Sequence, residues 1–208
     1  MLATFCLLVL GLAAYVGIGL YKIEHAVHHV SIPQSLLAQG QNDLLTIVRG
    51  PHHSEEAYLF HTHGNHTNVL NIPVALGVTV DNHTVRLSSL NIHAPVAIIT
   101  GLRGVGIPVS RYVGVDLHTV DPNSSLGKLA TGKVSVTSLI ANPTGTTALL
   151  EEVASHVYLG PNTSVTALLS LMHVPTTHAV WVPTSPAAHG TVVLASAPYV
   201  TVLRHFTS

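Results

Sequence analysis

Short apolar runs and amphipathic stretches alternate along most of this 208-residue chain, and this order limits the possible folds more than any other feature. Six runs are typical of buried strands bounded by turn residues: 44–48, 57–63, 68–80, 112–120, 178–183 and 190–196. Helical spacing of apolar residues predicts four helices: 93–102, 147–159, 164–174 and 198–206. Strands interleaved with helices favour an α/β sandwich.

Short polar segments between the predicted strands indicate tight turns. Gly64-Asn65 separates the runs 57–63 and 68–80 and predicts a hairpin, and Asp81-Asn82-His83 predicts a second turn. Trp181 lies within an apolar run, so we expect it in the core or lining a cavity.

The first 21 residues contain no charged side chain and are mostly leucine, valine, alanine and glycine. A cleaved secretory signal would need basic residues before this run and a small-residue cleavage site after it, and neither is present. The run is long enough for a membrane-spanning helix. We therefore expect a transmembrane anchor at 1–22, a connector at 23–41, and a single domain at 42–208.

Charge and cysteine content exclude several classes of protein. Charged residues make up 8% of the chain, against about a quarter in an ordinary globular protein. The net charge of −1 gives no electrostatic footprint for nucleic acid, so we expect no nucleic-acid partner. A single cysteine excludes an internal disulfide framework and a cysteine-based zinc finger.

Five segments form an ordered set along the chain: 42–45, 54–61, 69–75, 106–116 and a tail from 142 to 184. Residues 54–61 begin with Ser-Glu-Glu, and residues 106–116 run from Gly-Ile-Pro to Tyr-Val-Gly-Val-Asp. Together these segments resemble the LytR–CpsA–Psr family of cell-envelope proteins, which has a Ser-Asp-Thr strand entry and a Gly-Ile-Pro segment that ends in Tyr-Val-x-Val-Asp. Glu55 stands where the family has the aspartate, so the chain is identified as a divergent member.

The resemblance implies an α/β/α sandwich with a mixed central sheet, outside the cytoplasm behind a single-pass anchor in the cell membrane. It also implies an activity, because enzymes of this family transfer a glycopolymer, as a phosphate ester, from a polyprenyl-pyrophosphate carrier to peptidoglycan. Acidic residues hold Mg²⁺ there and arginines clamp the pyrophosphate, because fixed cations stabilise charge on phosphate oxygens. A polyprenyl-linked glycopolymer or wall polymer is the implied partner.

Carried over to this sequence, the resemblance gives Arg49 and Glu55 as catalytic candidates, with Glu55 also the Mg²⁺ ligand. The candidate phosphate-binding residues are Arg86, Arg103 and Arg111. Where the family has arginine and aspartate after Ile-Pro, this chain has Val74 and Ala75, and residues 117–141 contain no arginine. These differences predict weakened or lost catalysis, so the sequence leaves open whether the chain is an enzyme.

A second motif leads to a different hypothesis. His61, His63 and His66 have His-x-His-x-x-His spacing after an apolar strand, which resembles the metallo-β-lactamase signature. Imidazoles so placed can bind zinc and activate a water for hydrolysis. The alternatives to an envelope transferase are therefore a zinc-dependent hydrolase built on these histidines, or a non-catalytic binding or structural domain of the envelope. A solvated hairpin tip is the simplest interpretation of the histidines.

Overall fold

The computed structural model describes residues 20–39, 42–50, 55–64, 66–130, 133, 149, 151–165, 167, 176–187, 190–195, 202 and 206. Its helices are α2 (Leu20–Ala26), α3 (Val96–Gly104) and α4 (Ser125–Ala130), with short 3-10 helices η1 (Gln34–Leu36) and η3 (Leu87–Ser89). Its strands are β1 (His28–His29), β2 (Asp43–Arg49), β3 (Glu55–His63), β4 (His66–Ile72), β5 (Gly77–Val80), β6 (His83–Arg86), β7 (Arg111–Asp116), β8 (Val157–Leu159), β9 (Thr176–Trp181), β10 (Thr184–Pro186) and β11 (Val192–Leu194).

Seven strands form one central sheet in the order β1-β8-β7-β2-β3-β4-β9. Strand β2 pairs in parallel with β7 and antiparallel with β3, and β4 pairs in parallel with β9. The mixed central sheet that the resemblance implied is therefore confirmed. Two small hairpins, β5-β6 and β10-β11, lie outside this sheet.

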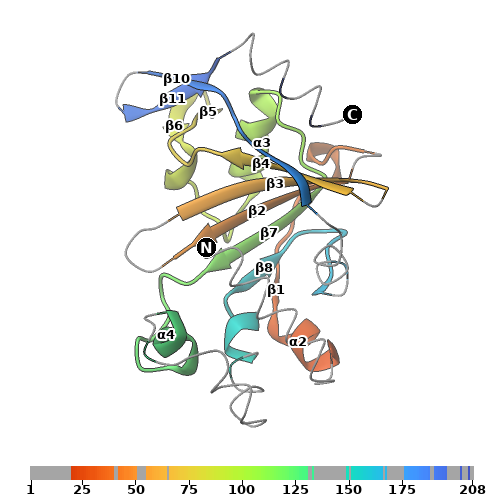
Figure 1. Cartoon of the computed structure of the whole chain (residues 1–208), viewed down its shortest axis with the longest axis vertical. Coiled ribbons are helices and arrows are strands. Elements are labelled where there is room, and N and C mark those ends of the chain that lie inside the picture. The colour runs from red at the N-terminus through yellow and green to blue at the C-terminus, as the bar shows by residue number, and fades with distance from the viewer. Residues whose placement is uncertain are drawn as a thin grey trace.

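Helices cover the two faces of the sheet, with α3 on one side and α2 and α4 on the other (Figure 1). Alternation along β2 explains why both faces need a cover, because Leu44 and Val48 pack into one apolar cluster while Leu45 and Ile47 pack into the other. The first cluster includes Ile23 from α2 and Leu126 from α4. The sheet is therefore the middle layer of a sandwich, and its strand ends remain available for a site.

Both predicted turns are confirmed. His63 pairs with His66 across the two-residue connection that contains Gly64, whose φ of 56° suits glycine. Asp81 and Asn82 also have positive φ angles, and they join β5 to β6 in the manner of a hairpin turn with two left-handed residues.

Three local predictions are wrong. The run 68–80 is two strands, because Pro73 follows β4 and has no amide hydrogen to extend the ladder. The predicted helix 147–159 ends early, and its last three residues form β8, which pairs with β7 and β1. Trp181 is 69% exposed, because it lies on β9 at the edge of the sheet.

The expected membrane anchor falls almost entirely on residues 1–19, which lie outside the described residues. Across the described ranges, none of the helices has the length and apolar character needed to cross a membrane. The stretch expected to be a connector contributes four buried side chains to the two clusters, namely Ile23, Val27, Ile32 and Leu37. Most of the predicted helices 164–174 and 198–206 also lies outside the described residues.

Candidate functional site

Arg49 and Glu55, the two catalytic candidates, meet at one end of the central sheet. Arg49 ends β2 and Glu55 begins β3, and the antiparallel register places them opposite each other. Arg49 Nε donates to Glu55 Oε1 at 3.2 Å. Asp116 ends β7 and lies opposite Arg49 on its other side. We call this end of the sheet the Arg49 edge, defined by Arg49, Glu55, His93, Asp116 and Tyr158.

The guanidinium of Arg49 is held in a fixed orientation. Its Nη2 donates to the backbone carbonyls of Ser88 at 3.0 Å and Leu90 at 2.5 Å, and its Nε is used by Glu55. The remaining nitrogen, Nη1, has no hydrogen-bond partner among the described residues, and the side chain is 25% exposed. Arg49 therefore fastens the β2–β3 end to the η3 segment and still has donors for an anion.

The Glu55 side chain is largely buried, although it forms an ion pair with Arg49. Burial raises the pKa of its carboxyl above the ordinary value and the charge of Asp116 raises it further, while Arg49 acts in the opposite direction. Two carboxylates and one guanidinium thus share a small region. A bound cation or phosphate group would change the balance among these three charges.

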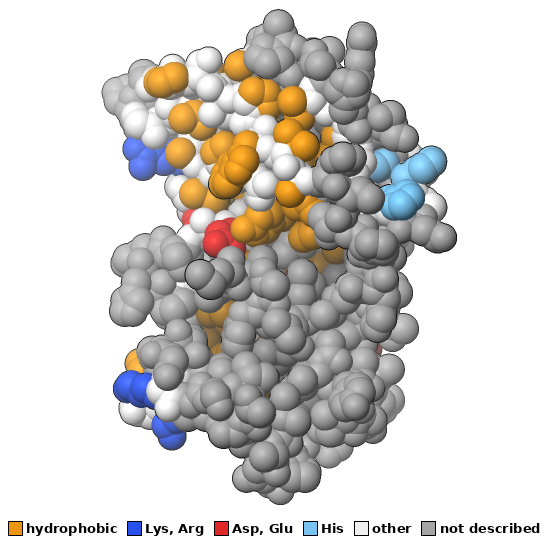
Figure 2. Space-filling view, in the orientation of Figure 1, with side chains coloured by type: hydrophobic (Ala, Val, Ile, Leu, Met, Phe, Trp, Pro, Cys, Tyr) orange, Lys and Arg blue, Asp and Glu red, His pale blue; other side chains and the backbone are white. Residues whose placement is uncertain are grey.

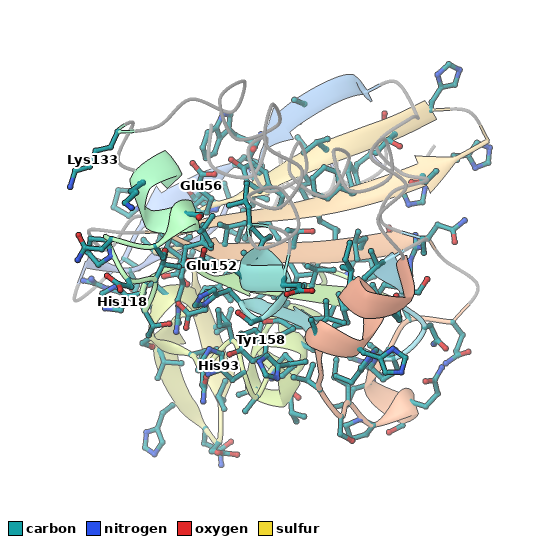
Figure 3. The ribbon with its side chains drawn as sticks, turned by 90° about the horizontal axis from the view of Figure 1, so that it is seen from below. Glu56, His93, His118, Lys133, Glu152 and Tyr158 are labelled. Carbon is teal, nitrogen blue, oxygen red and sulfur yellow. The ribbon has the colours of Figure 1, made fainter. Side chains whose placement is uncertain are left out.

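Asp116 and His93 form a second polar pair at this edge. His93 Nε2 lies 2.8 Å from Asp116 Oδ2, and the backbone N–H of His118 donates to Asp116 Oδ1 at 3.0 Å. The His93 ring stacks on Tyr158, with centroids 4.2 Å apart, and Tyr158 stacks in turn on His28 at 5.0 Å. Figure 3 shows His93 and Tyr158 side by side.

Sequence reasoning assigned no role to His93 or Tyr158, and it used Asp116 only as part of a matching segment. One signal points to Asp116, since an acidic residue that ends a buried strand lies at the edge where parallel strands end together. His93 lies 23 residues away in sequence from its carboxylate, and no local spacing reveals that contact.

The four arginines do not converge on one clamp. Arg111 begins β7 beside Leu44, five residues before Asp116, and a strand rises about 3.3 Å per residue, so Arg111 lies about 16 Å from the Arg49 edge. Arg103 lies in the last turn of α3 and donates to the carbonyl of Ser35 at 2.7 Å. Only Arg86 lies near Arg49 in the fold, two residues before Ser88, whose carbonyl binds Arg49.

Arg111 belongs to a different polar cluster, which we call the Asp43 end and define by Asp43, His61, Ser110 and Arg111. His61 Nδ1 lies 2.7 Å from Asp43 Oδ1, and Ser110 Oγ accepts from the Asp43 N–H and donates to its carbonyl. Burial raises the pKa of Asp43 and lowers that of Arg111, while their mutual attraction opposes both shifts. Within the described part of the chain, Asp43 Oδ2, His61 Nε2 and Arg111 Nε have no partner.

The structure does not support a zinc site at the histidine motif. His61 is buried and paired with Asp43, whereas His63 and His66 are exposed at the β3-β4 hairpin, where histidine atoms stand out in Figure 2. Among the described residues, no three His, Cys, Asp or Glu side chains form a group able to hold a metal ion. A solvated hairpin tip describes His63 and His66, but not His61.

No family model matches the sequence, and no curated protein matches it. Solved structures do match. The LytR-Csp2A-Psr enzyme from Actinomyces oris is 14% identical, covers 88% of this chain and 96% of its own, and superposes with a TM-score of 0.55. TagT of Bacillus subtilis is 14% identical, and the match covers 82% of this chain and 91% of TagT with a TM-score of 0.48. The transcriptional regulator yvhJ of Bacillus subtilis is 14% identical, and the match covers 81% of this chain and 96% of yvhJ with a TM-score of 0.49.

The likeness to the Actinomyces oris enzyme shows that this chain has the LytR–CpsA–Psr fold. The resemblance read from five short sequence segments is therefore confirmed at the level of the fold.

Proposed function

We propose that this chain is a cell-envelope transferase of weakened activity, which moves a wall glycopolymer, as a phosphate ester, from a polyprenyl-pyrophosphate carrier to a hydroxyl of peptidoglycan. The observation that supports this proposal is the meeting of Arg49, Glu55 and Asp116 at one strand edge of a chain with the LytR–CpsA–Psr fold. Phosphate transfer needs fixed cationic groups beside the phosphate oxygens, and the Arg49 edge provides one.

The activity is weakened because that edge offers few cations. Arg103 and Arg111 lie elsewhere, and two of the three nitrogens of Arg49 are already used within the protein. Removal of one charge-stabilising donor typically lowers kcat by about 10² to 10³. A chain that relies on Arg49, with Arg86 on the adjacent segment, should therefore turn over far more slowly than an enzyme with several converging arginines.

Mg²⁺ is the metal that fits the donors at this edge. It is usually bound by one or two carboxylates together with substrate phosphates. Both oxygens of Asp116 are hydrogen-bonded, whereas Glu55 Oε2 has no hydrogen-bond partner among the described residues. We therefore assign Glu55 as the one protein carboxylate that would hold the ion beside the phosphates. When bound, the ion would neutralise charge on the phosphate oxygens.

The membrane and the carrier lipid belong to the same proposal. The uncharged run at 1–21 would place the domain against the membrane outer surface as a single-pass anchor, with the main domain outside the cytoplasm. A carrier that is itself a membrane lipid would then meet the site without leaving the bilayer.

The test is a transfer assay with the full chain in detergent. A synthetic polyprenyl-pyrophosphate-linked disaccharide serves as the donor and peptidoglycan as the acceptor, with Mg²⁺ present. Arg49→Ala should lower transfer about 100-fold. Arg49→Lys should give an intermediate rate, because lysine keeps the charge and loses the planar fork. Circular dichroism checks that both variants fold.

Arg103→Ala is the matched control, since it removes an exposed arginine of α3 that binds the carbonyl of Ser35, and it should change transfer by less than about twofold. Equal rates for Arg49→Ala and the wild type would contradict the proposal. Tight binding of polyprenyl pyrophosphate without any transfer would support the non-catalytic envelope-binding alternative instead.

A further inference from the structure

His93 has a well-defined tautomer because of its carboxylate partner. An ionised carboxylate only accepts hydrogen bonds, so the ring nitrogen 2.8 Å from Asp116 Oδ2, Nε2, carries the proton. In the neutral ring the other nitrogen, Nδ1, is then the basic atom. Asp116 is itself held at both oxygens, so it orients the imidazole and does not move with it.

Nδ1 of His93 is open to an incoming group. It has no hydrogen-bond partner among the described residues, and the side chain is 42% exposed. Stacking on Tyr158, with the two rings 18° from parallel, holds the ring plane, and the backbone N–H of His93 donates to Asn91 Oδ1. A histidine with one nitrogen fixed and the other open has the arrangement of a general base.

The basic nitrogen belongs to the same edge as the phosphate-binding candidates. Asp116, which holds His93, lies opposite Arg49 in the sheet. Arg49 also binds the carbonyl of Leu90, three residues before His93. The charge of Asp116 acts on Glu55, so the two carboxyl groups are electrostatic neighbours. The groups that face His93 are thus Asp116 from β7 and Tyr158 from β8, with His28, Glu55 and Arg49 beyond them.

We propose that His93 is the general base of the transfer reaction and that Asp116 is its positioning residue, an inference that rests on the proposed function. The acceptor is a sugar hydroxyl. Its oxygen forms the new bond to the phosphorus next to the glycopolymer, and its proton passes to His93 Nδ1. The bond between that phosphorus and the bridging oxygen breaks, and polyprenyl phosphate leaves with the bonding electrons. The proton returns to solvent through the exposed ring.

The experiment measures transfer against pH for the full chain and for His93→Gln, with the same lipid-linked disaccharide and peptidoglycan. A base that must be neutral to accept a proton predicts a wild-type rate that falls on acidification, which gives the pH profile an acid limb. His93→Gln should lower kcat by about 10² to 10⁴ and remove that limb, and its Kd for polyprenyl pyrophosphate should stay within about twofold. Asp116→Asn, which keeps the shape and loses the charge, should also lower kcat and displace the limb.

His63→Gln is the matched control, because it changes an exposed histidine on the β3-β4 hairpin, and its rate and pH profile should equal those of the wild type. Unchanged transfer and an unchanged pH limb in His93→Gln would overturn the role of His93 and leave the transferase proposal intact. A wild-type chain that transfers nothing at any pH would overturn both, and lipid binding by that chain would identify it as a binder.

Discussion

The two ends of β2 carry the same pair of chemical groups in different surroundings. At the Asp43 end His61 Nδ1 lies 2.7 Å from a carboxylate oxygen, and at the Arg49 edge His93 Nε2 lies 2.8 Å from another. Asp43 is fully buried and the His61 side chain is 10% exposed, whereas the His93 side chain is 42% exposed. The contact distance is almost equal, so burial distinguishes the two pairs.

Burial also decides what each pair can do. Phe206 covers the Asp43 end, since its ring lies 5.5 Å from that of His61 and its carbonyl accepts from Asn68 Nδ2 at 3.0 Å. A substrate has no access to a carboxylate under such a cover, and the pair there is a structural element. At the Arg49 edge the His93 side chain is 42% exposed and its Nδ1 has no hydrogen-bond partner among the described residues, so the same pair is suited to proton transfer.

We expect the largest loss of folding stability when one partner of the buried Asp43–His61 pair is removed. Asp43→Ala leaves His61 and Arg111 without their carboxylate inside the protein, and loss of one partner of a buried pair costs about 3 to 5 kcal/mol. Asp116 is also buried, but its partner His93 is 42% exposed and water can replace the lost contact, so Asp116→Ala should cost less, about 1.5 to 3 kcal/mol. Urea unfolding of both variants measures the difference in the free energy of unfolding.

Equal losses in the two variants would break the comparison, because they would show that burial does not separate the two ends. His61→Gln provides a control of different chemistry. It keeps much of the ring's volume and leaves Asp43 with a neutral neighbour, so we expect a smaller loss than for Asp43→Ala, about 1 to 3 kcal/mol.

The same contrast explains what the sequence could predict. The strand runs and the Gly64 hairpin depend on residues close in sequence, so the sequence predicts them. Arg49 and Glu55 were each named as candidates from the sequence, and the register of β2 with β3 shows that they meet. Other contacts depend on the tertiary fold, because β7 follows α3 in the chain and pairs in parallel with β2. That pairing brings Asp116 to His93 and keeps Arg111 away from Arg49. The hairpin-tip interpretation fails for His61, because the spacing of the motif gives no sign that this histidine pairs with Asp43.

Replacing Glu55 should have a smaller effect on the free energy of unfolding, and that effect should depend on pH. Because burial raises its pKa in the folded protein, the fold binds that proton more tightly than the unfolded chain does. The stability linked to this proton is present at low pH and is lost as the pH rises through the raised pKa. Glutamine resembles the protonated carboxyl, so Glu55→Gln should match the wild type near pH 4 and exceed its stability at about pH 7.

Urea unfolding at the two pH values measures that difference, and the transfer assay measures its functional cost. We expect Glu55→Gln to be more stable at neutral pH and less active, which is typical of a charged group kept at a site for function. A variant that is less stable than the wild type at neutral pH would show that the Arg49 ion pair outweighs the burial of Glu55.

The smallest effect concerns the exposed histidines of the hairpin. His63→Ala changes a side chain at the tip of β3 for which the structure shows no metal cluster among the described residues, so its free energy of unfolding should stay within about 0.5 kcal/mol of the wild type. Added zinc should leave Tm equal in the two proteins, and the purified chain should carry no stoichiometric zinc by elemental analysis. Zinc that is bound one-to-one and lost in His63→Ala would instead require His61 to leave Asp43, and would restore the hydrolase hypothesis.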